Sequence, residues 1–460
     1  MSLSLSYLTP IRRDLLAIMQ AALDAVDPFT AVERVLQRDG DTLHLQSLSP
    51  FTLSLSSFER IFVIGAGKAG APMAQAVENL LGEWLSGGVV VVKYDHLAPL
   101  SRVELREAAH PMPDEAGLAA GQSILALAEE ATERDLVLCL LSGGGSALLE
   151  VLPAPLTLDD LQVTTAALLA CGATINEINA VRKHLSRVKG GQLARAVAPA
   201  TLITLVLSDV VGSPLDVIVS GPTVADHSTW AEVAEIVSRY DLGAALPTTV
   251  RKRILAGVAG NLPETPKRGD SLFANAPVII VGDNAQAAAA GQQEAEARGY
   301  DSAILTTFLE GEAREVAKVA VALGREVQAF GRPCSVPACL ILGGETTVTL
   351  GSLQSPIGKG GRNQELALAA ALALSGQEGI TIGALATDGT DGPTDSAGAI
   401  VDDSTVARAV VQNLSATDHL TRHDAYPLLN TVGDLLCSGP TNTNVNDLLF
   451  VMVEGVTGKS

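Results

Sequence analysis

The chain has 460 residues, of which 47% are hydrophobic, 18% are charged and 3% are aromatic. This apolar share supports a buried core and excludes a disordered chain, and the length predicts two or three domains. The net charge of −20 disfavours binding to nucleic acid or to an anionic membrane surface. Any anion site must therefore be local.

No apolar run reaches the length that spans a membrane, and the N-terminus lacks the pattern of a signal peptide. The five cysteines are scattered without CxxC spacing. This usage is typical of reduced thiols and predicts a cytoplasmic protein. The acidic charge and the lack of a spanning run predict no membrane partner.

Residues 11–37 carry a helical period that is broken near Pro28 and predict two helices. After them, short apolar strands alternate with glycine-containing loops and helices. The predicted strands are 58–64, 89–92, 136–141, 201–207, 277–281, 338–342, 380–386 and 447–453. The alternation predicts an α/β fold with a largely parallel sheet, and in such sheets ligands bind at the carboxyl ends of strands. The Gly-, Pro- and charge-rich segment 257–277 predicts a boundary between domains 1–257 and 277–460.

The first glycine loop follows the strand 58–64 and precedes a predicted helix at 71–85. Gly65, Gly67 and Gly70 have the spacing of a dinucleotide fingerprint, which lets the backbone approach a phosphate. The acid expected after the second strand is matched only loosely, by Asp95. Lys68 opposes the helix dipole, which favours a functional role over a solvated loop lysine.

The second glycine loop consists of Ser142, Gly143, Gly144, Gly145 and Ser146. Three consecutive glycines are costly to order, and a nest of N–H groups for an anion explains them better than a tight turn. The GxxxxGK[ST] pattern of a P-loop is absent from the sequence.

The segment 179–191 is the most basic in the chain. If it is helical, Asn179, Lys183 and Ser186 share one face. An anion site and a solvated or ion-paired face are equally compatible with this pattern. Asn179, Arg182 and Lys183 are the candidate substrate-binding residues of the segment.

Carboxylates follow several predicted strands: Asp209, Glu345, and either Asp388 or Asp391. Their positions suit Mg²⁺, which prefers oxygen ligands, although any single Asp can instead cap a helix. Gly343 precedes Glu345 in a further predicted phosphate-binding loop. The strand 338–342 is expected to end at this loop.

Arg362 stands at the start of a predicted helix, again against the dipole, where an arginine can clamp a phosphate. Asn363 can cap that helix. The loop that begins at His110 is rigid because of two prolines and is interpreted as structural or substrate-positioning.

Glycine loops, isolated cations and carboxylates together favour phosphoryl transfer, because its catalysis consists mostly of positioning and charge neutralisation. In these motifs the chain resembles the class II glycerate kinases, the MOFRL family, from residue 63 almost to the C-terminus. The resemblance rests on nine blocks in order: GAGKAG (65–70), HPMPDEAG (110–117), LSGGGSALL (141–149), NAVRKHLSRVKGGQLA (179–194), LSDVVGSPLDVIVSGPT (207–223), GGETTV (343–348), GKGGRNQELAL (358–368), ATDGTDGPTDSAGA (386–399) and GPTNTNVNDL (439–448).

The resemblance implies a Rossmann-like N-terminal domain and a MOFRL C-terminal domain, with an active site in the cleft between them. It implies transfer of the γ-phosphoryl group of ATP to D-glycerate, giving 2-phosphoglycerate, with Mg²⁺ as the metal. Lys68 and Arg362 match the family's catalytic cations. Asp209 and Asp388 match site aspartates that serve as metal ligands or base. Ser213 stands where the family usually has an acid, which implies a weaker metal site if that acid helps to bind the metal.

Two other functions are compatible with parts of the sequence. An NAD(P)-dependent hydroxypyruvate reductase would explain the GxGxxG spacing, but it lacks a clear ribose-binding acid. A non-catalytic metabolite-binding protein would not need Lys68, Asp209, Arg362 and Asp388 together. Small molecules are the expected partners, and a monomer and a homodimer are equally compatible with the sequence.

Overall fold

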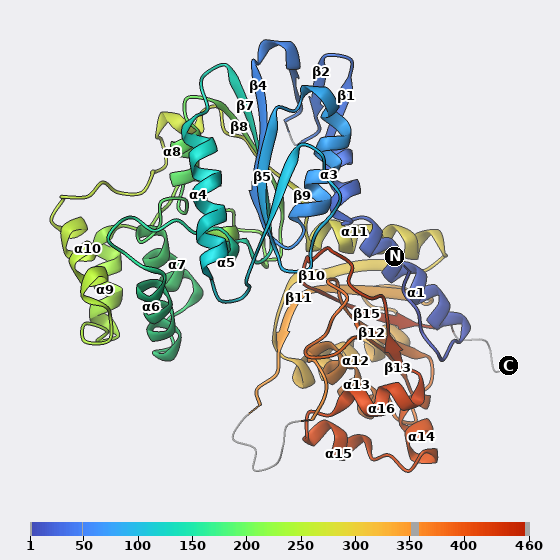
Figure 1. Cartoon of the computed structure of the whole chain (residues 1–460). Helices are drawn as coiled ribbons and strands as arrows, with labels where there is room; N and C mark the ends of the chain where they lie inside the picture. Colours follow the sequence, from blue (N-terminus) through green and yellow to red (C-terminus); the bar gives the residue numbers. More distant parts are fainter. Residues whose placement is uncertain (1, 48, 351–357, 456–460) are drawn as a thin grey trace. The chain divides into compact units, whose positions relative to one another are not determined.

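A computed structural model describes residues 2–47, 49–350 and 358–455. The chain divides into two compact units, an N-terminal unit of Pro28–Val281 and a C-terminal unit of Met1–Asp27 with Gly282–Ser460 (Figure 1). This division differs from the expected domains 1–257 and 277–460 at both borders. Helix α1 (Pro10–Asp24) packs on α11 (Asn284–Ala297), and β9 (Val278–Gly282) completes the sheet of the N-terminal unit.

The N-terminal unit is built on a six-stranded sheet of order β6-β5-β4-β7-β8-β9, and β4 to β8 pair in parallel. Besides β9, its strands are β4 (Arg60–Ala66), β5 (Gly87–Lys93), β6 (Val103–Ala108), β7 (Asp135–Ser142) and β8 (Thr201–Leu207). The central strands are apolar on both faces, as in sheets covered by helices on two sides. The predicted Rossmann-like α/β arrangement is confirmed.

Alternate residues of β5 show how the sheet is covered. Val90 and Val92 face Gly70 at the start of α3 (Gly70–Leu81). Val89 and Val91 share a core cluster with Ile124 of α4 (Glu115–Glu129). Since neighbouring residues of a strand point to opposite faces, α3 and α4 lie on opposite sides of the sheet.

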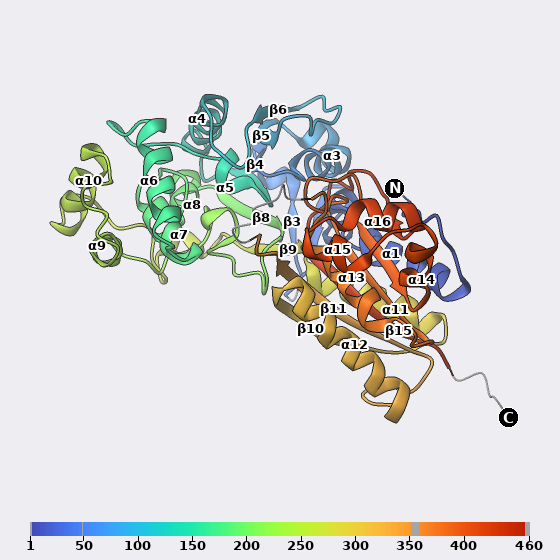
Figure 2. The same cartoon turned by 90° about the horizontal axis from the view of Figure 1, so that it is seen from below.

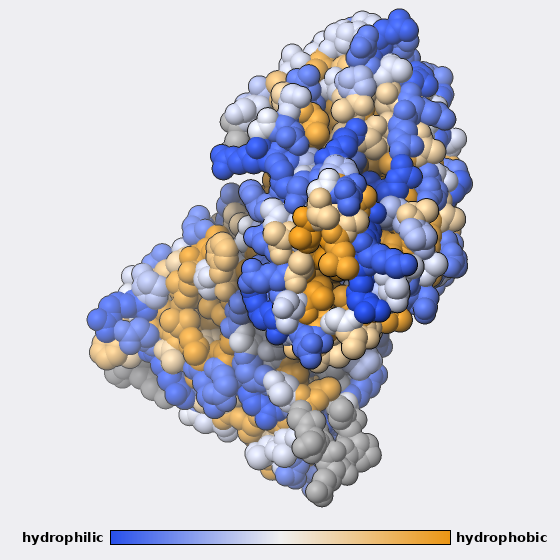
Figure 3. All heavy atoms as spheres, turned by 90° about the vertical axis from the view of Figure 1, so that its left-hand side faces the viewer, coloured by the Kyte–Doolittle hydropathy of each residue, from blue (hydrophilic) through white to orange (hydrophobic). Residues whose placement is uncertain are grey.

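A layer of four helices in the N-terminal unit has a core of its own, around Val181, Trp230 and Val250. These helices are α6 (Leu158–Ala170), α7 (Ile175–His184), α9 (Trp230–Arg239) and α10 (Thr248–Val258). Figure 3 views the side on which α9 and α10 lie and shows apolar atoms gathered among hydrophilic ones. Leu169 and Leu255 are among the exposed apolar side chains of these helices.

The remaining elements of the N-terminal unit are short. They are α2 (Pro28–Val35), α5 (Gly145–Leu148), α8 (Gln192–Val197) and the antiparallel strands β1 (Leu36–Asp39), β2 (Thr42–Leu45) and β3 (Phe51–Ser54).

The C-terminal unit contains a second six-stranded sheet, of order β10-β11-β15-β12-β13-β14. Its strands are β10 (Asp301–Glu312), β11 (Ala338–Thr347), β12 (Ile380–Ala386), β13 (Gly398–Asp402), β14 (Leu435–Leu436) and β15 (Asp447–Val453). Among the described strands, β10 and β11 pair in parallel, whereas β15 runs antiparallel to both β11 and β12. The expected parallel sheet is therefore found in the N-terminal unit, whereas the sheet of the C-terminal unit is mixed. An apolar run buried on both faces does not reveal the direction in which its strand runs.

Helices cover both faces of this second sheet (Figure 2). On one face, Ile341 and Phe450 approach Gly291 of α11, and α1 places Leu15 and Met19 against Gly383. On the other face, Val451 packs with α12 (Ala313–Phe330) and α13 (Arg362–Leu374). Three shorter helices complete the unit: α14 (Ser404–Val411), α15 (Ala416–Thr421) and α16 (Ala425–Val432).

In the described parts of the chain, no single helix is long and apolar enough to cross a membrane, and one bent pair, α1 with α2 at 57°, passes that test by length and composition. The apolar faces of both helices are buried in the protein core. All five cysteines are free thiols.

Candidate active site

In the first glycine loop, three backbone N–H groups donate hydrogen bonds to other groups of the protein, whereas the lysine side chain is partly exposed. The N–H of Gly67 donates to the Val91 carbonyl at 3.1 Å, that of Lys68 to the Gly143 carbonyl at 2.9 Å, and that of Ala69 to Ser142 Oγ at 3.1 Å. The loop therefore does not offer these N–H groups to a pyrophosphate. The Lys68 side chain remains partly exposed.

The glycines of this loop allow neighbouring strands to pack closely. A Cβ on Gly65 would overlap the Leu140 carbonyl of β7, and one on Gly67 would overlap Ser142. Only glycine lets β4 and the end of β7 approach so closely. The spacing that resembles a dinucleotide fingerprint is thus explained by contact between two glycine loops.

The second loop brings several predicted residues together at the carboxyl end of β7. A Cβ on Gly143 would overlap the Asp209 carboxylate, so Asp209 lies directly against this loop. Gly144 has a φ of +80°, which favours glycine. The Oγ of Ser146 lies 2.8 Å from Ser220 Oγ, which in turn donates to Asn179 Oδ1 at 3.0 Å.

Two cations, the half-buried Arg182 and the buried Lys189, contact the end of this loop. Arg182 and Lys189 both donate to the Ser146 carbonyl, at 2.8 and 2.9 Å, and Lys189 also donates to the Leu149 carbonyl. Arg182, a candidate substrate-binding residue from the sequence, contacts the loop in this structure. Burial lowers the pKa of Lys189 to about 8, although the neighbouring Glu150 opposes this shift. Sequence reasoning missed Lys189, because a basic segment does not show which of its cations are buried.

Lys183 lies inside the unit, 3.1 Å from Asp226 and 3.6 Å from Asp216. Together with Asn179 it lines a cavity of about 530 Å³ that several carboxylates also line. Of the two alternatives open for this helix face, the ion-paired one is therefore observed for Lys183.

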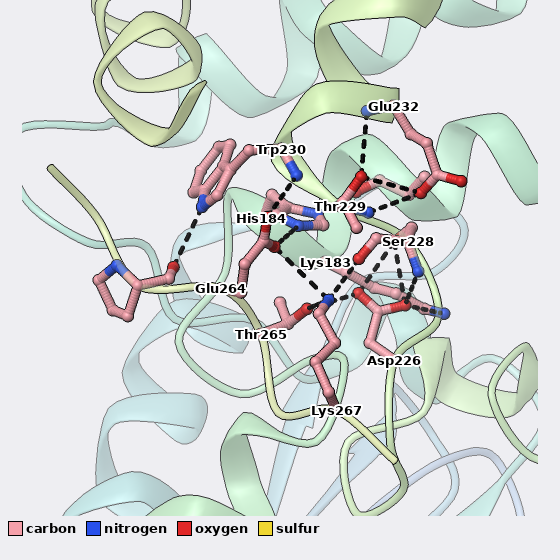
Figure 4. A network of polar contacts seen from close by, with 12 residues as sticks. Lys183, His184, Asp226, Ser228, Thr229, Trp230, Glu232, Glu264, Thr265 and Lys267 are labelled. Carbon is pink, nitrogen blue, oxygen red and sulfur yellow. Dashed lines mark hydrogen bonds and ion pairs between the residues drawn. The ribbon is translucent and has the colours of Figure 1, made fainter. Parts of the chain in front are cut away.

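The segment before β9 is tied to the helical layer through Asp226 (Figure 4). Asp226 accepts hydrogen bonds from Thr265 at 2.8 Å and from Ser228, in addition to Lys183. Glu264 binds the backbone N–H of Trp230 and lies 3.2 Å from His184. Part of the predicted linker 257–277 is therefore fixed within the N-terminal unit.

In the C-terminal unit, the central feature is the guanidinium of Arg362 at the start of α13. Its Nε and one terminal nitrogen contact Asp447 at 2.5 and 3.0 Å, and the other terminal nitrogen contacts Glu345 at 2.5 Å. These contacts use three of the five N–H donors of the side chain, which leaves two for a ligand. Burial, with Asp391 and Glu345 nearby, raises the pKa of Asp447 to about 7 despite its contact with Arg362.

Asp388 and Asp391 have different surroundings, which separates the two candidates. Asp391 is buried and accepts from the backbone N–H groups of Asn363 at 3.1 Å and Gln364 at 2.8 Å, so it caps α13. Asp388 is partly exposed and receives the N–H of Thr390 at 3.0 Å. Asp391 is thus a structural cap, and Asn363 does not fill that role.

A cavity of about 450 Å³ is lined by Asp388, Arg362, the glycines of the 358–361 loop and His423. Glu365 stands at its wall, held by Arg314 and by His423 Nδ1 at 2.7 Å. The cavity thus has one partly free guanidinium and one partly exposed carboxylate.

Gly343 and Glu345 do not form the expected loop after a strand. Strand β11 continues to Thr347, and Gly343 pairs with Leu448 of β15. A Cβ on Gly343 would overlap the side chain of Asn284, so this glycine makes room for a buried amide. The expected end of the strand at residue 342 is wrong, and Glu345 contacts Arg362 from within β11.

Within the described residues, no three His, Cys, Asp or Glu side chains are grouped so that they could hold a metal ion. A kinase Mg²⁺ site commonly uses one or two carboxylates together with substrate phosphates. The partly exposed carboxylate of Asp388 fits such a site. Ser213 lies in a turn with a φ of +50°, and its hydroxyl replaces the carboxylate expected at that position.

Two α/β units, each with a cation and carboxylates beside a glycine-rich loop, define the class of protein. The DUF4147 model, described as a domain of unknown function, matches residues 14–255, and the MOFRL family model matches residues 338–447. A glycerate 2-kinase from Pyrococcus horikoshii is 39% identical over 98% of this chain and 99% of its own length. A D-glycerate 2-kinase from Thermotoga maritima is 42% identical over 87% of this chain and 93% of its own.

Solved structures agree with these relatives. A crystal structure from P. horikoshii has a TM-score of 0.86 at 39% identity and covers 98% of this chain and 100% of that one. A glycerate kinase structure from T. maritima has a TM-score of 0.85 at 39% identity, with coverage of 96% and 99%. The chain belongs to the class II glycerate kinase family, as its motifs predict.

Proposed function

We propose that this protein is a glycerate 2-kinase, which transfers the γ-phosphoryl group of ATP to O2 of D-glycerate. The observation that carries this proposal is the match over 98% of the chain to a relative that bears this name. The partly exposed cations Lys68 and Arg362 and the carboxylates beside them fit a reaction that depends on charge neutralisation.

In the proposed reaction, the hydroxyl oxygen at C2 attacks the γ-phosphorus, a new O–P bond forms, and the bond to the bridging oxygen breaks to release ADP. The hydroxyl proton passes to a carboxylate, for which Asp209 and Asp388 are the candidates. Lys68 and Arg362 neutralise the substrate carboxylate and the transferring group. Mg²⁺, when bound with ATP, would neutralise phosphate charge, and Asp388 and Asp209 are its proposed ligands.

A hydroxypyruvate reductase is the second candidate, because a relative from Agrobacterium vitis, 43% identical over 86% of the chain, provisionally bears that name. The N–H groups of the first glycine loop are already bonded within the protein, and Asp95 lies beyond the end of β5. Both observations favour the kinase. The free thiols favour the cytoplasm as its proposed location.

The proposal is tested by ADP release with ATP, Mg²⁺ and D-glycerate, with the product passed to enolase. Turnover without a phosphoglycerate mutase is expected, because enolase accepts 2-phosphoglycerate directly. Turnover only with the mutase would move the phosphate to O3. Oxidation of NAD(P)H with hydroxypyruvate, without ADP release, would favour the reductase.

A further inference from the structure

A histidine that the proposed reaction does not use lies beside Lys68 and the second glycine loop. His110 follows β6, whose carboxyl end lies at the same edge of the sheet as those of β4 and β7. A Cβ built on Gly144 would lie 3.0 Å from Cδ2 and 3.3 Å from Nε2 of His110, and 3.3 Å from Cγ of Lys68. The imidazole edge and the lysine stem therefore meet at the Gly144 backbone.

The His110 ring is half-buried, and it makes no hydrogen bond to any residue that the structure describes. A neutral imidazole has one N–H donor and one acceptor. Burial, with Lys68, Lys93 and His96 nearby, lowers the pKa of His110 to about 4. Near pH 7 the ring is therefore neutral and has a donor available.

The surrounding charges favour an anion at this place. Lys68 and Lys93 are cations, and His96 Nδ1 lies 3.3 Å from the Lys68 carbonyl. Of the nearby carboxylates, Asp114 caps α4 and accepts from Tyr94, and Glu107 accepts the N–H of Asp95. Asp95 lies beside His96, and Asp209 faces the other side of the loop at Gly143.

We propose that His110 is a substrate-contacting residue, whose ring and the Lys68 ammonium together bind one anionic oxygen group beside Gly144. This inference rests on the proposed function. The anionic group is a phosphoryl group of the nucleotide or the carboxylate of the hydroxy acid. Both present oxygens that accept from an N–H donor and a lysine.

The test compares His110→Ala with His110→Gln in the full-length protein, with His44→Gln in β2 as a control for the loss of a histidine. We expect His110→Ala to raise the KM of one substrate about tenfold or more, as for loss of a hydrogen bond to a charged group. A higher KM for ATP identifies the phosphoryl group, and a higher KM for D-glycerate identifies the carboxylate. His110→Gln should recover most of the loss, because its amide N–H replaces the Nε2 donor.

Unchanged values of KM in His110→Ala, or no recovery in His110→Gln, would overturn the inference. A measurement on the wild-type protein covers the case in which the variants fail to fold. Histidine ring NMR signals are followed while pyrophosphate or D-glycerate is added, which requires no turnover. We expect the chemical shifts of the His110 ring to change when one of these probes is added. Chemical shifts that stay the same with both probes would overturn the inference. Absence of wild-type turnover would instead count against the proposed function.

Discussion

Arg362 and Asp447 form a two-point contact between α13 and β15, with N–O distances of 2.5 and 3.0 Å. The residues are 85 positions apart in the sequence. The contact fixes the plane of the guanidinium. Arg362 also lines the cavity of about 450 Å³. A lysine could not reproduce this geometry, because its ammonium lacks the planar fork.

We therefore expect Arg362→Lys to lower kcat/KM by at least ~100-fold, the scale of losing one preorganised transition-state contact. The coupled ADP-release assay measures this loss. Arg325→Lys on α12, whose side chain contacts Gln377 and the Ala373 carbonyl, is the matched control and should keep its activity. Near-wild-type kinetics in Arg362→Lys would contradict a role for the fork geometry.

Lys68→Ala should also lower kcat/KM by at least ~100-fold, because an uncompensated negative charge develops in its absence. The free energy of unfolding should change by less than ~0.5 kcal/mol, since the side chain is partly exposed. Lys252→Ala, an exposed position on α10, should change neither quantity. An equal loss of activity in both variants would contradict the assignment.

Asp388 and Asp391 provide a comparison between two neighbouring aspartates. Asp391→Ala removes the cap of α13 and should lower the free energy of unfolding by ~1–2 kcal/mol. Asp388→Ala should leave stability within ~0.5 kcal/mol while lowering kcat/KM. Urea denaturation and the kinase assay, applied to both variants, separate these effects. The reverse pattern would exchange the two roles.

Gly143→Ala tests the contact between the second glycine loop and Asp209. The added Cβ would overlap the Asp209 carboxylate and displace it. We expect a loss of about 100-fold in kcat/KM, since small misplacements of a reacting group have effects of this size. Gly243→Ala is the matched control, because nothing lies within 4 Å of its Cβ. If both variants keep full activity, the position of Asp209 does not matter to catalysis.

Stability should depend on pH through His110. Its pKa is about 4 in the folded chain, against an ordinary value of about 6.5. Between these values the unfolded chain binds a proton that the folded chain does not, so the free energy of unfolding falls as the pH drops from 6.5 to 4. Urea denaturation at pH 7, 5.5 and 4.5 should show a smaller fall in His110→Gln. An identical fall in both proteins would show that His110 does not contribute.

Strand positions could be predicted from the sequence where an apolar run is bounded by turn residues. The predicted strands 201–207, 380–386 and 447–453 have the same bounds as β8, β12 and β15. Strand β10 was missed, since its side chains are mostly half-buried or exposed and give no continuous apolar run. Gly343 and Gly344 resemble a loop in the sequence, but they lie within β11. Glycine is required there because a Cβ would overlap Asn284 or Leu309, which are distant in the sequence.

Lys68 and Arg362 could be singled out from the sequence, because a cation at the start of a helix opposes a dipole that depends only on local chain direction. The α/β architecture was also predictable, because burial on both faces leaves continuous apolar runs that alternate with helices. Only the tertiary structure showed that Asp391 caps α13 and that α1 belongs to the C-terminal unit. Only the tertiary structure showed that Arg182 and Lys189 donate to the Ser146 carbonyl of the second glycine loop. These outcomes depend on partners far along the chain, and the free energy of burying a charge is decided by those partners and not by sequence neighbours.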